Sequence, residues 1–372
     1  MNTLIPVTVV TGFLGSGKTT LLSGLIKNRQ TRRLALLINE FGEVAIDGAL
    51  IRDSARGDFQ VQVEDFPHGL IAYGDDENFV PALQAIAKRR AQVDHVLIET
   101  SGLALPTAVM EMLQTPALAQ DFILDATLAV VDTPLLLSDQ FERDQNSPHA
   151  AVADLVATLF EQQLEYADVV VLNKIDALDE NDLLRAETRV RERAPKVRFL
   201  ELAYHAQLDI RLALGLRLHQ PTLAPHAHRF TAVAMPDANA ALLTDQECLN
   251  GHAHSGLLGH SHGLATHKHF HEQDPGWLSF VLRSQELQQA ETLKIALIAS
   301  AKAEPILRIK GFVRTADPAH AVLIQGVRTR MAISTNAAKK SARESAVVFI
   351  GYHTSRVRVA ALLSELTGTV WK

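Results

Sequence analysis

The sequence predicts an α/β domain with a mostly parallel sheet and helices on both faces, followed by a smaller C-terminal α+β domain. Short apolar runs of strand length alternate with longer segments of helical periodicity over the first part of the chain. A glycine-rich turn follows the first apolar run, and a stretch rich in proline, glycine and histidine precedes a second series of elements. Strands that alternate with helices favour parallel pairing through right-handed crossovers.

The elements of the first domain follow in order from this pattern. The first apolar run, Val7–Val10, is β-branched and suits a buried strand, and Thr19–Asn28 after the glycine-rich turn is typical of a helix. Helical periodicity also marks Phe79–Arg90 and Asp154–Tyr166. The further strand-length runs are Leu34–Ile38, Val96–Ile98, Thr127–Val131 and Val169–Leu172.

The pattern changes between about Leu218 and Pro275, where ten of the sixteen histidines fall and periodicity fades. We expect a linker or mobile insertion there. Regular elements then resume, so the predicted division is 1–217, 218–275 and 276–372. The second series consists of a strand from Trp277, a helix at Gln285–Ala299, strands at Ile306–Val313, Ala321–Gln325 and Ala346–Ile350, and a helix at Ser355–Leu366.

Composition narrows the class of protein. The chain has 372 residues, of which 47% are apolar, and its net charge of −6 is spread along it, which argues against nucleic-acid binding. Its one cysteine, Cys248, allows no internal disulfide. The first residues lack the features of a leader peptide, and no apolar run reaches the roughly 18 residues of a membrane span. We expect a cytoplasmic protein.

The glycine-rich turn carries the strongest motif. Gly12–Thr19 matches G-x-x-x-x-G-K-[ST] between a predicted strand and a predicted helix, as a P-loop NTPase requires. Its backbone N–H groups and the helix N-terminus would bind phosphate oxygens. Lys18 would reach the β- and γ-phosphates, and the Thr19 hydroxyl would bind Mg²⁺. The candidate nucleotide-binding residues are Gly12, Gly15, Ser16, Gly17, Lys18, Thr19 and Thr20.

A second motif indicates which base is bound. Asn173, Lys174 and Asp176 form N-K-x-D at the end of a predicted buried strand. An aspartate there can accept hydrogen bonds from N1 and the exocyclic amino group of guanine, and adenine lacks this pair of donors. Downstream of a P-loop, the motif favours GTP over ATP.

A third motif lies between these two. The apolar run at Val96–Ile98 leads into Glu99, followed by Thr100, Ser101 and Gly102. A carboxylate at the end of a strand beside the P-loop supports Mg²⁺, usually through water, and a nearby glycine can swing toward the γ-phosphate. We therefore expect Lys18, Thr19 and Glu99 to be catalytic and Gly102 to contact the nucleotide.

Together the motifs resemble a known family. GFLGSGKTT, NEFGE at 39–43, ETSGLALP at 99–106 and NKID at 173–176 are similar to those of the CobW family of metal-chaperone GTPases, whose more distant relatives are UreG and HypB. The segments Ile306–Val313 and Val347–Gly351 look like that family's second domain. The resemblance implies slow GTP hydrolysis coupled to delivery of zinc or cobalt to a client metalloprotein. Because the sequence shows no certain catalytic base, a client or a second subunit, as in a homodimer, is a candidate to complete the site.

The same resemblance assigns two switch segments, Asn39–Asp47 and Glu99–Pro106, which GTP and Mg²⁺ would order. It places Glu40 and Glu43 in the first of them, with Glu40 near Mg²⁺ or the transferred metal. No residue stands out as the base for the attacking water.

One motif of the family is missing. Where the family carries G-C-x-C-C, this chain has Gly69 followed by Leu70, Ala72 and Tyr73 at the three cysteine positions. None of these supplies a soft ligand. A site could be rebuilt from His68, Glu40, Glu43 and Asp65, metal could be held by the histidine-rich segment alone, or the protein could handle no transition metal.

The histidine-rich segment is the other candidate metal site. Its clusters have H-x-H spacing, which lets two imidazoles face one ion on an extended backbone, and imidazole suits Zn²⁺, Ni²⁺ and Co²⁺. A solvated linker that binds metal incidentally is the alternative. The clustered residues are His252, His254, His260, His262, His267, His269 and His271.

Three functional hypotheses therefore remain. The first is a GTPase that delivers a metal, and the second is a GTP-dependent protein-binding switch without a metal cargo. The third is an ATP-using enzyme such as a small-molecule kinase, which a preference for ATP over GTP would favour.

Overall fold

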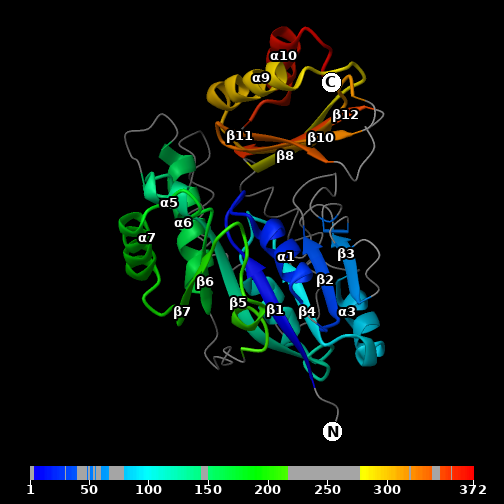
Figure 1. Cartoon of the computed structure of the whole chain (residues 1–372), viewed down its shortest axis with the longest axis vertical. Helices are drawn as coiled ribbons and strands as arrows, with labels where there is room; N and C mark the ends of the chain where they lie inside the picture. Colours follow the sequence, from blue (N-terminus) through cyan, green and yellow to red (C-terminus); the bar gives the residue numbers. More distant parts are fainter. Residues whose placement is uncertain are drawn as a thin grey trace, which may run out of the picture.

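The computed structural model (Figure 1) describes residues 4–29, 31–39, 48, 51–52, 55, 60–66, 79–143, 150–216, 277–317, 320–336, 344–352 and 354–372. These residues form a seven-stranded and a five-stranded sheet. The predicted linker 218–275 and residues 40–47 of the first predicted switch lie outside them. Within the described ranges, no helix is long and apolar enough to cross a bilayer.

The seven-stranded sheet is parallel throughout, in the order β3-β2-β4-β1-β5-β6-β7. This confirms the predicted parallel α/β architecture. Since the strands are parallel, their carboxyl ends meet at one edge, where ligands of such sheets bind. The strands are β1 (Ile5–Thr11), β2 (Leu34–Asn39), β3 (Val61–Phe66), β4 (His95–Glu99), β5 (Phe122–Asp132), β6 (Val169–Asn173) and β7 (Phe199–Ala203).

Both faces of this sheet are covered, as predicted. In β4, Val96 and Ile98 pack with helices α3 and α4, while Leu97 packs on the other face with α1. Alternation along a strand produces this division. The helices are α1 (Lys18–Lys27), α3 (Phe79–Lys88), η2 (Arg90–Gln92), α4 (Thr107–Leu113), α5 (Thr133–Leu137), α6 (Ala150–Glu165), α7 (Glu180–Arg193) and η3 (Ile210–Leu212).

The second sheet is antiparallel, in the order β11-β10-β9-β12-β8, and forms the predicted smaller α+β domain. Val347 and Phe349 of β12 pack in the core that includes α9 and α10, whereas Val348 and Ile350 belong to the opposite face. The elements are β8 (Trp277–Ser284), α9 (Ala290–Ala303), β9 (Ile306–Val313), β10 (Ala321–Val327), β11 (Arg330–Asn336), β12 (Ser345–Tyr352) and α10 (Arg356–Thr367).

The face of the second sheet away from its helices packs on the first domain. Figure 1 shows this sheet beyond one end of the parallel strands, with α9 and α10 on its far side. Val348 and Ile350 share one buried cluster with Phe13 and Leu14 of the glycine-rich turn and with Leu103. Burial of these apolar side chains joins the second domain directly to the turn.

Some elements differ from the expectation. Helix α9 begins at Ala290 rather than Gln285, because Gln288 is held by other contacts: its N donates to Arg314 O at 2.8 Å and its Nε2 to Ser284 Oγ at 3.2 Å. The sequence pattern does not predict β3, β7 or β11, all of which are edge strands. Their polar positions interrupt the apolar runs that mark central strands. Helices α4, α5 and α7 are also missed.

Candidate nucleotide site

The glycine-rich turn joins β1 to α1 in a shape that needs glycine. Gly12, Gly15 and Gly17 have φ angles of 133°, 73° and 99°, and a Cβ on Gly17 would lie 2.3 Å from Nδ2 of Asn173. The turn thus brings the N-terminus of α1, with its positive end of the helix dipole, to the carboxyl edge of the sheet. That arrangement suits an anion such as phosphate.

Lys18 is buried over this turn. Its Nζ donates to the carbonyl oxygens of Gly12 at 2.8 Å and Phe13 at 3.3 Å. Charged phosphate oxygens are stronger acceptors than carbonyls, so a bound phosphate would compete for the ammonium. Ser16 Oγ is buried without a hydrogen-bond partner in the described part of the chain, and it can donate to an incoming oxygen ligand. Thr20 is exposed.

Two oxygen-bearing side chains meet beside Lys18. Thr19 Oγ1 donates to Glu99 Oε1 at 3.0 Å, and both residues are buried. Glu99 is the last residue of β4, whose parallel pairing with β1 sets it level with Val10 just before the turn. Hydroxyl, carboxylate and phosphate oxygens are the ligands that Mg²⁺ takes in such sites, so this pair fits a magnesium ion.

The segment after β4 lies against the turn. A Cβ on Gly102 would lie 2.8 Å from the backbone N of Leu14, so the two backbones approach closely. On its other side, the Gly102 carbonyl accepts a hydrogen bond from Gln163 Nε2 of α6 at 3.3 Å. A movement of Gly102 toward a ligand would therefore have to break or shift the contact with Gln163.

Asn173 and Lys174, at the end of β6, donate hydrogen bonds to the glycine-rich turn. Asn173 Nδ2 donates to Ser16 O at 2.8 Å, and Lys174 Nζ donates to Gly15 O at 2.5 Å and to Asp132 Oδ2 at 2.7 Å. Burial lowers the pKa of Lys174, Asp132 opposes that shift, and Arg330 and Arg308 of the second domain add to it. The residues at the end of β6 thus stabilise the conformation of the turn through hydrogen bonds.

Asp176 faces a segment that the sequence did not single out. Its Oδ1 accepts the backbone N–H of His205 at 2.5 Å and lies 3.0 Å from His205 Nδ1. His205 follows the edge strand β7 and has a φ of 51°. Residues 203–206 therefore lie beside Asp176 at the carboxyl edge of the sheet. An edge strand paired with β6 would have predicted that the residues after it lie near Asp176. The mixed polar and apolar residues of β7 hide that strand in the sequence.

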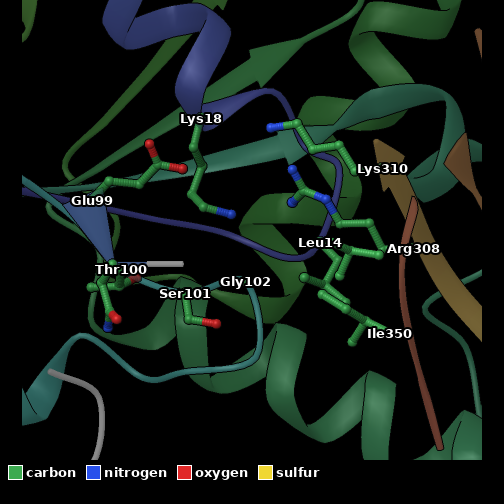
Figure 2. A pocket seen from close by; sticks show the side chains of 11 residues that line it. Leu14, Lys18, Glu99, Thr100, Ser101, Gly102, Arg308, Lys310 and Ile350 are labelled. Atoms are coloured by element: carbon green, nitrogen blue, oxygen red, sulfur yellow. The ribbon is translucent and has the colours of Figure 1, made fainter. Parts of the chain in front are cut away.

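A pocket opens between the two domains on the side of Lys18 and Glu99. Figure 2 shows Arg308 and Lys310 of β9 reaching toward it from one side, and Thr100 and Ser101 lying on the other. The two basic residues escaped the sequence analysis. The lining residues are Leu14, Lys18, Asn39, Glu99, Thr100, Ser101, Gly102, Arg308, Lys310, Val348 and Ile350.

The structure does not test the predicted transition-metal ligands. Glu40, Glu43, His68 and the seven clustered histidines fall outside the described residues, as does the side chain of Asp65 in β3. The residues that the structure describes include no group of three or more histidine, cysteine, aspartate or glutamate side chains able to hold a metal ion.

Comparison with known proteins matches both halves of the chain. Residues 6–201 match the family model described as the CobW/HypB/UreG nucleotide-binding domain, and residues 277–367 match the cobalamin synthesis protein cobW C-terminal domain. The chain is 31% identical over 381 residues to the zinc chaperone CobW of Pseudomonas aeruginosa, covering 97% of this chain and 91% of that relative. It is 34% identical over 169 residues to the zinc chaperone YeiR of Escherichia coli, covering 45% and 46%.

Among solved structures, the Zn(II)-bound YjiA GTPase from Escherichia coli aligns with a TM-score of 0.40 at 20% identity, covering 98% of this chain and 99% of that one. The two matched regions of the sequence correspond to the two sheets of the fold.

Proposed function

Because this chain belongs to the CobW/HypB/UreG family, we propose that it is a GTPase that couples slow GTP hydrolysis to the delivery of a transition metal, zinc or cobalt, to a client protein. The observation that carries the GTP assignment is the meeting of three motifs at one edge of the parallel sheet. Lys18 and Thr19 follow β1, Glu99 ends β4, and Asp176 follows β6. Such an edge is where α/β sheets bind nucleotides.

In this proposal the chain mainly positions the nucleotide. Lys18 and the amides of the glycine-rich turn bind the β- and γ-phosphates, and Asp176 accepts hydrogen bonds from guanine. Thr19 and Glu99 would hold Mg²⁺, and the ion would supply positive charge beside the phosphates. Asn173 and Lys174 keep the turn in shape through Ser16 O and Gly15 O. Positioning without a dedicated base accounts for slow turnover.

The metal cargo is inferred from relatives. Proteins named zinc chaperones are 31% identical to this chain over 97% of its length and 34% identical over 45% of it. A relative from Schizosaccharomyces pombe, 27% identical over 214 residues, is named zinc-regulated GTPase metalloprotein activator 1. We infer that the client is a metalloprotein and that delivery takes place in the cytoplasm.

Equilibrium dialysis of the purified full chain with Zn²⁺, Co²⁺ and Ni²⁺, with and without a nonhydrolysable GTP analogue, tests this function. We expect one metal ion to bind the full chain more tightly than it binds a scrambled histidine-rich peptide. We also expect its affinity for the chain to depend on the nucleotide. A second sample, with asparagine in place of the seven clustered histidines, separates that segment from a site that includes Glu40 and His68. Binding no tighter than that of the peptide in every sample would rule out metal delivery.

The missing cysteines favour a second candidate function. Leu70, Ala72 and Tyr73 stand where the family carries thiolates, and thiolates supply most of the affinity of such sites for soft metals. The chain would then be a GTP-dependent switch that binds a client without a metal cargo. Client binding would depend on the nucleotide, would not respond to chelators, and would survive deletion of residues 250–272.

A further inference from the structure

Strand β9 of the second domain directs two basic side chains at the phosphate side of the first domain. Arg308 and Lys310 line the pocket beside Lys18, and Figure 2 shows both extending toward it. Between them, Ile309 is fully buried in the core that contains residues of α9 and α10. Because side chains alternate along a strand, Arg308 and Lys310 share the opposite face, which packs on the glycine-rich turn.

The sheet holds these two residues in register. Arg308 pairs with Ile350 of β12 and Val327 of β10, while Lys310 pairs with Val348 of β12. Val327 in turn touches the glycine-rich turn, since a Cβ on Gly15 would lie 1.9 Å from its Cγ2. The two cations are therefore carried by one central strand, β9, of the sheet that packs on the phosphate-binding turn, rather than by a surface loop.

The charge of this pocket fits an anion. Three of its lining side chains, Lys18, Arg308 and Lys310, are cationic, and Glu99 is the one acidic residue among its described lining. Lys310 is only 4% exposed. A magnesium-bound triphosphate remains anionic and would interact favourably with this group of cationic side chains.

The position within the site points to one end of that triphosphate. Arg308 and Lys310 share the pocket with Lys18, which reaches the β- and γ-phosphates in P-loop proteins, and with Ser101 and Gly102. The guanine side, marked by Asp176 and His205, is formed by other segments. Cations that share one pocket with Lys18 and with the segment after Glu99 lie on the side of the γ-phosphate.

We propose that the second domain completes the phosphate site in cis, with Arg308 and Lys310 binding the γ-phosphate of GTP. This inference rests on the proposed GTPase function and names which residues of the other domain serve it. A guanidinium at the γ-phosphate stabilises charge in the transition state. Hydrolysis and phosphate release then remove the anion that these two residues bind, so the contact between the domains depends on the nucleotide state.

Calorimetry on the full chain tests the assignment, using the Mg²⁺ complexes of a nonhydrolysable GTP analogue and of GDP. The variants are Arg308→Gln and Lys310→Met, the latter keeping the apolar stem of a buried side chain. The control is Arg283→Gln on β8, whose side chain is 44% exposed and pairs with Glu344 away from the pocket. Thermal unfolding of each variant checks that it is folded.

For Arg308→Gln we expect the Kd of the analogue to rise about tenfold or more and that of GDP to change less than about twofold, since only the analogue has the γ-phosphate. The rate constant for GTP hydrolysis should fall at least about tenfold, and Arg308→Lys should restore part of it. Lys310→Met should also weaken binding of the analogue more than binding of GDP, and Arg283→Gln should change neither Kd.

Equal effects on the analogue and on GDP, or no effect on either, would overturn the assignment. In that case Arg308 and Lys310 would serve only to pack the domains, and the GTPase proposal would stand. If instead the wild-type chain binds no GTP in the presence of Mg²⁺, the proposed function itself fails, and this inference fails with it.

Discussion

Asp132 links the N-K-x-D motif, the glycine-rich turn and the second domain. Replacing it with asparagine should weaken the contacts that join these three parts. This last residue of β5 is 1% exposed, and its Oδ2 accepts hydrogen bonds from Lys174 Nζ at 2.7 Å and from the guanidinium of Arg330. Its Oδ1 caps α5 by accepting from Leu135 N at 3.2 Å. Asparagine keeps the size and the capping oxygen, so Asp132→Asn removes the charge and replaces the accepting Oδ2 with an amide group that donates.

The size of the effect follows from how exposed the partners are. The side chains of Lys174 and Arg330 are 33% and 44% exposed, whereas the carboxylate is buried. Removing one partner from a fully buried ion pair costs about 3–5 kcal/mol, while an exposed pair contributes less than about 1 kcal/mol. We expect Asp132→Asn to lower the free energy of unfolding by about 2 kcal/mol, between these limits.

Chemical denaturation of the full chain measures this free energy. Asp182→Asn is a matched control, because Asp182 pairs with Arg185 on the surface of α7. A double-mutant cycle with Arg330→Gln should give a coupling of about 1 kcal/mol between Asp132 and Arg330. If Asp132→Asn costs no more than Asp182→Asn, the carboxylate does not hold the junction and the reasoning is refuted.

Three further predictions concern single residues. Asp176→Asn should weaken GTP binding about a hundredfold while the affinity for ATP changes little. Equal losses of affinity for both nucleotides in a competition assay would contradict guanine recognition. Gly15→Ala should disturb the contact with Val327 and weaken GTP binding, Val327→Ala in the same chain should restore part of it, and no rescue would refute the clash. Burial lowers the pKa of His95 to about 4 from 6.5, so the folded state binds fewer protons than the unfolded state between these values. Stability should therefore fall by roughly 3 kcal/mol as the pH falls through this window, and His95→Gln should remove most of that slope in denaturation curves.

Much of the fold was predictable because its signals are local. Central strands such as β4 and β6 contain the uninterrupted apolar runs Val96–Ile98 and Val169–Leu172, and the glycine-rich turn between β1 and α1 has a fixed spacing. The edge strands β3, β7 and β11 were missed, since polar residues break their apolar pattern. The start of α9 was placed too early for a similar reason, because Gln288 contacts Ser284 and Arg314 rather than a helical turn.

The candidate site divides in the same way. Lys18, Glu99 and Asp176 each end or follow a predicted parallel strand, and the common direction of those strands was enough to expect them at one edge. Nothing in the sequence indicated that His205 would face Asp176, because it follows an edge strand without a motif. The predicted ligands Glu40, Glu43 and His68 remain sequence-based hypotheses.

The sequence by itself determined the class of each domain and the presence of a phosphate-binding turn and a guanine motif, because contiguous residues at fixed spacing encode them. Only the tertiary structure decided that Arg308, Lys310 and Arg330 reach the first domain. Asp132 and Arg330 are 198 residues apart in the chain, and only the docking of one sheet onto the other brings them together. The physical reason is that strand alternation specifies which side chains share a face, whereas burial of the apolar side chains between the domains specifies what that face meets.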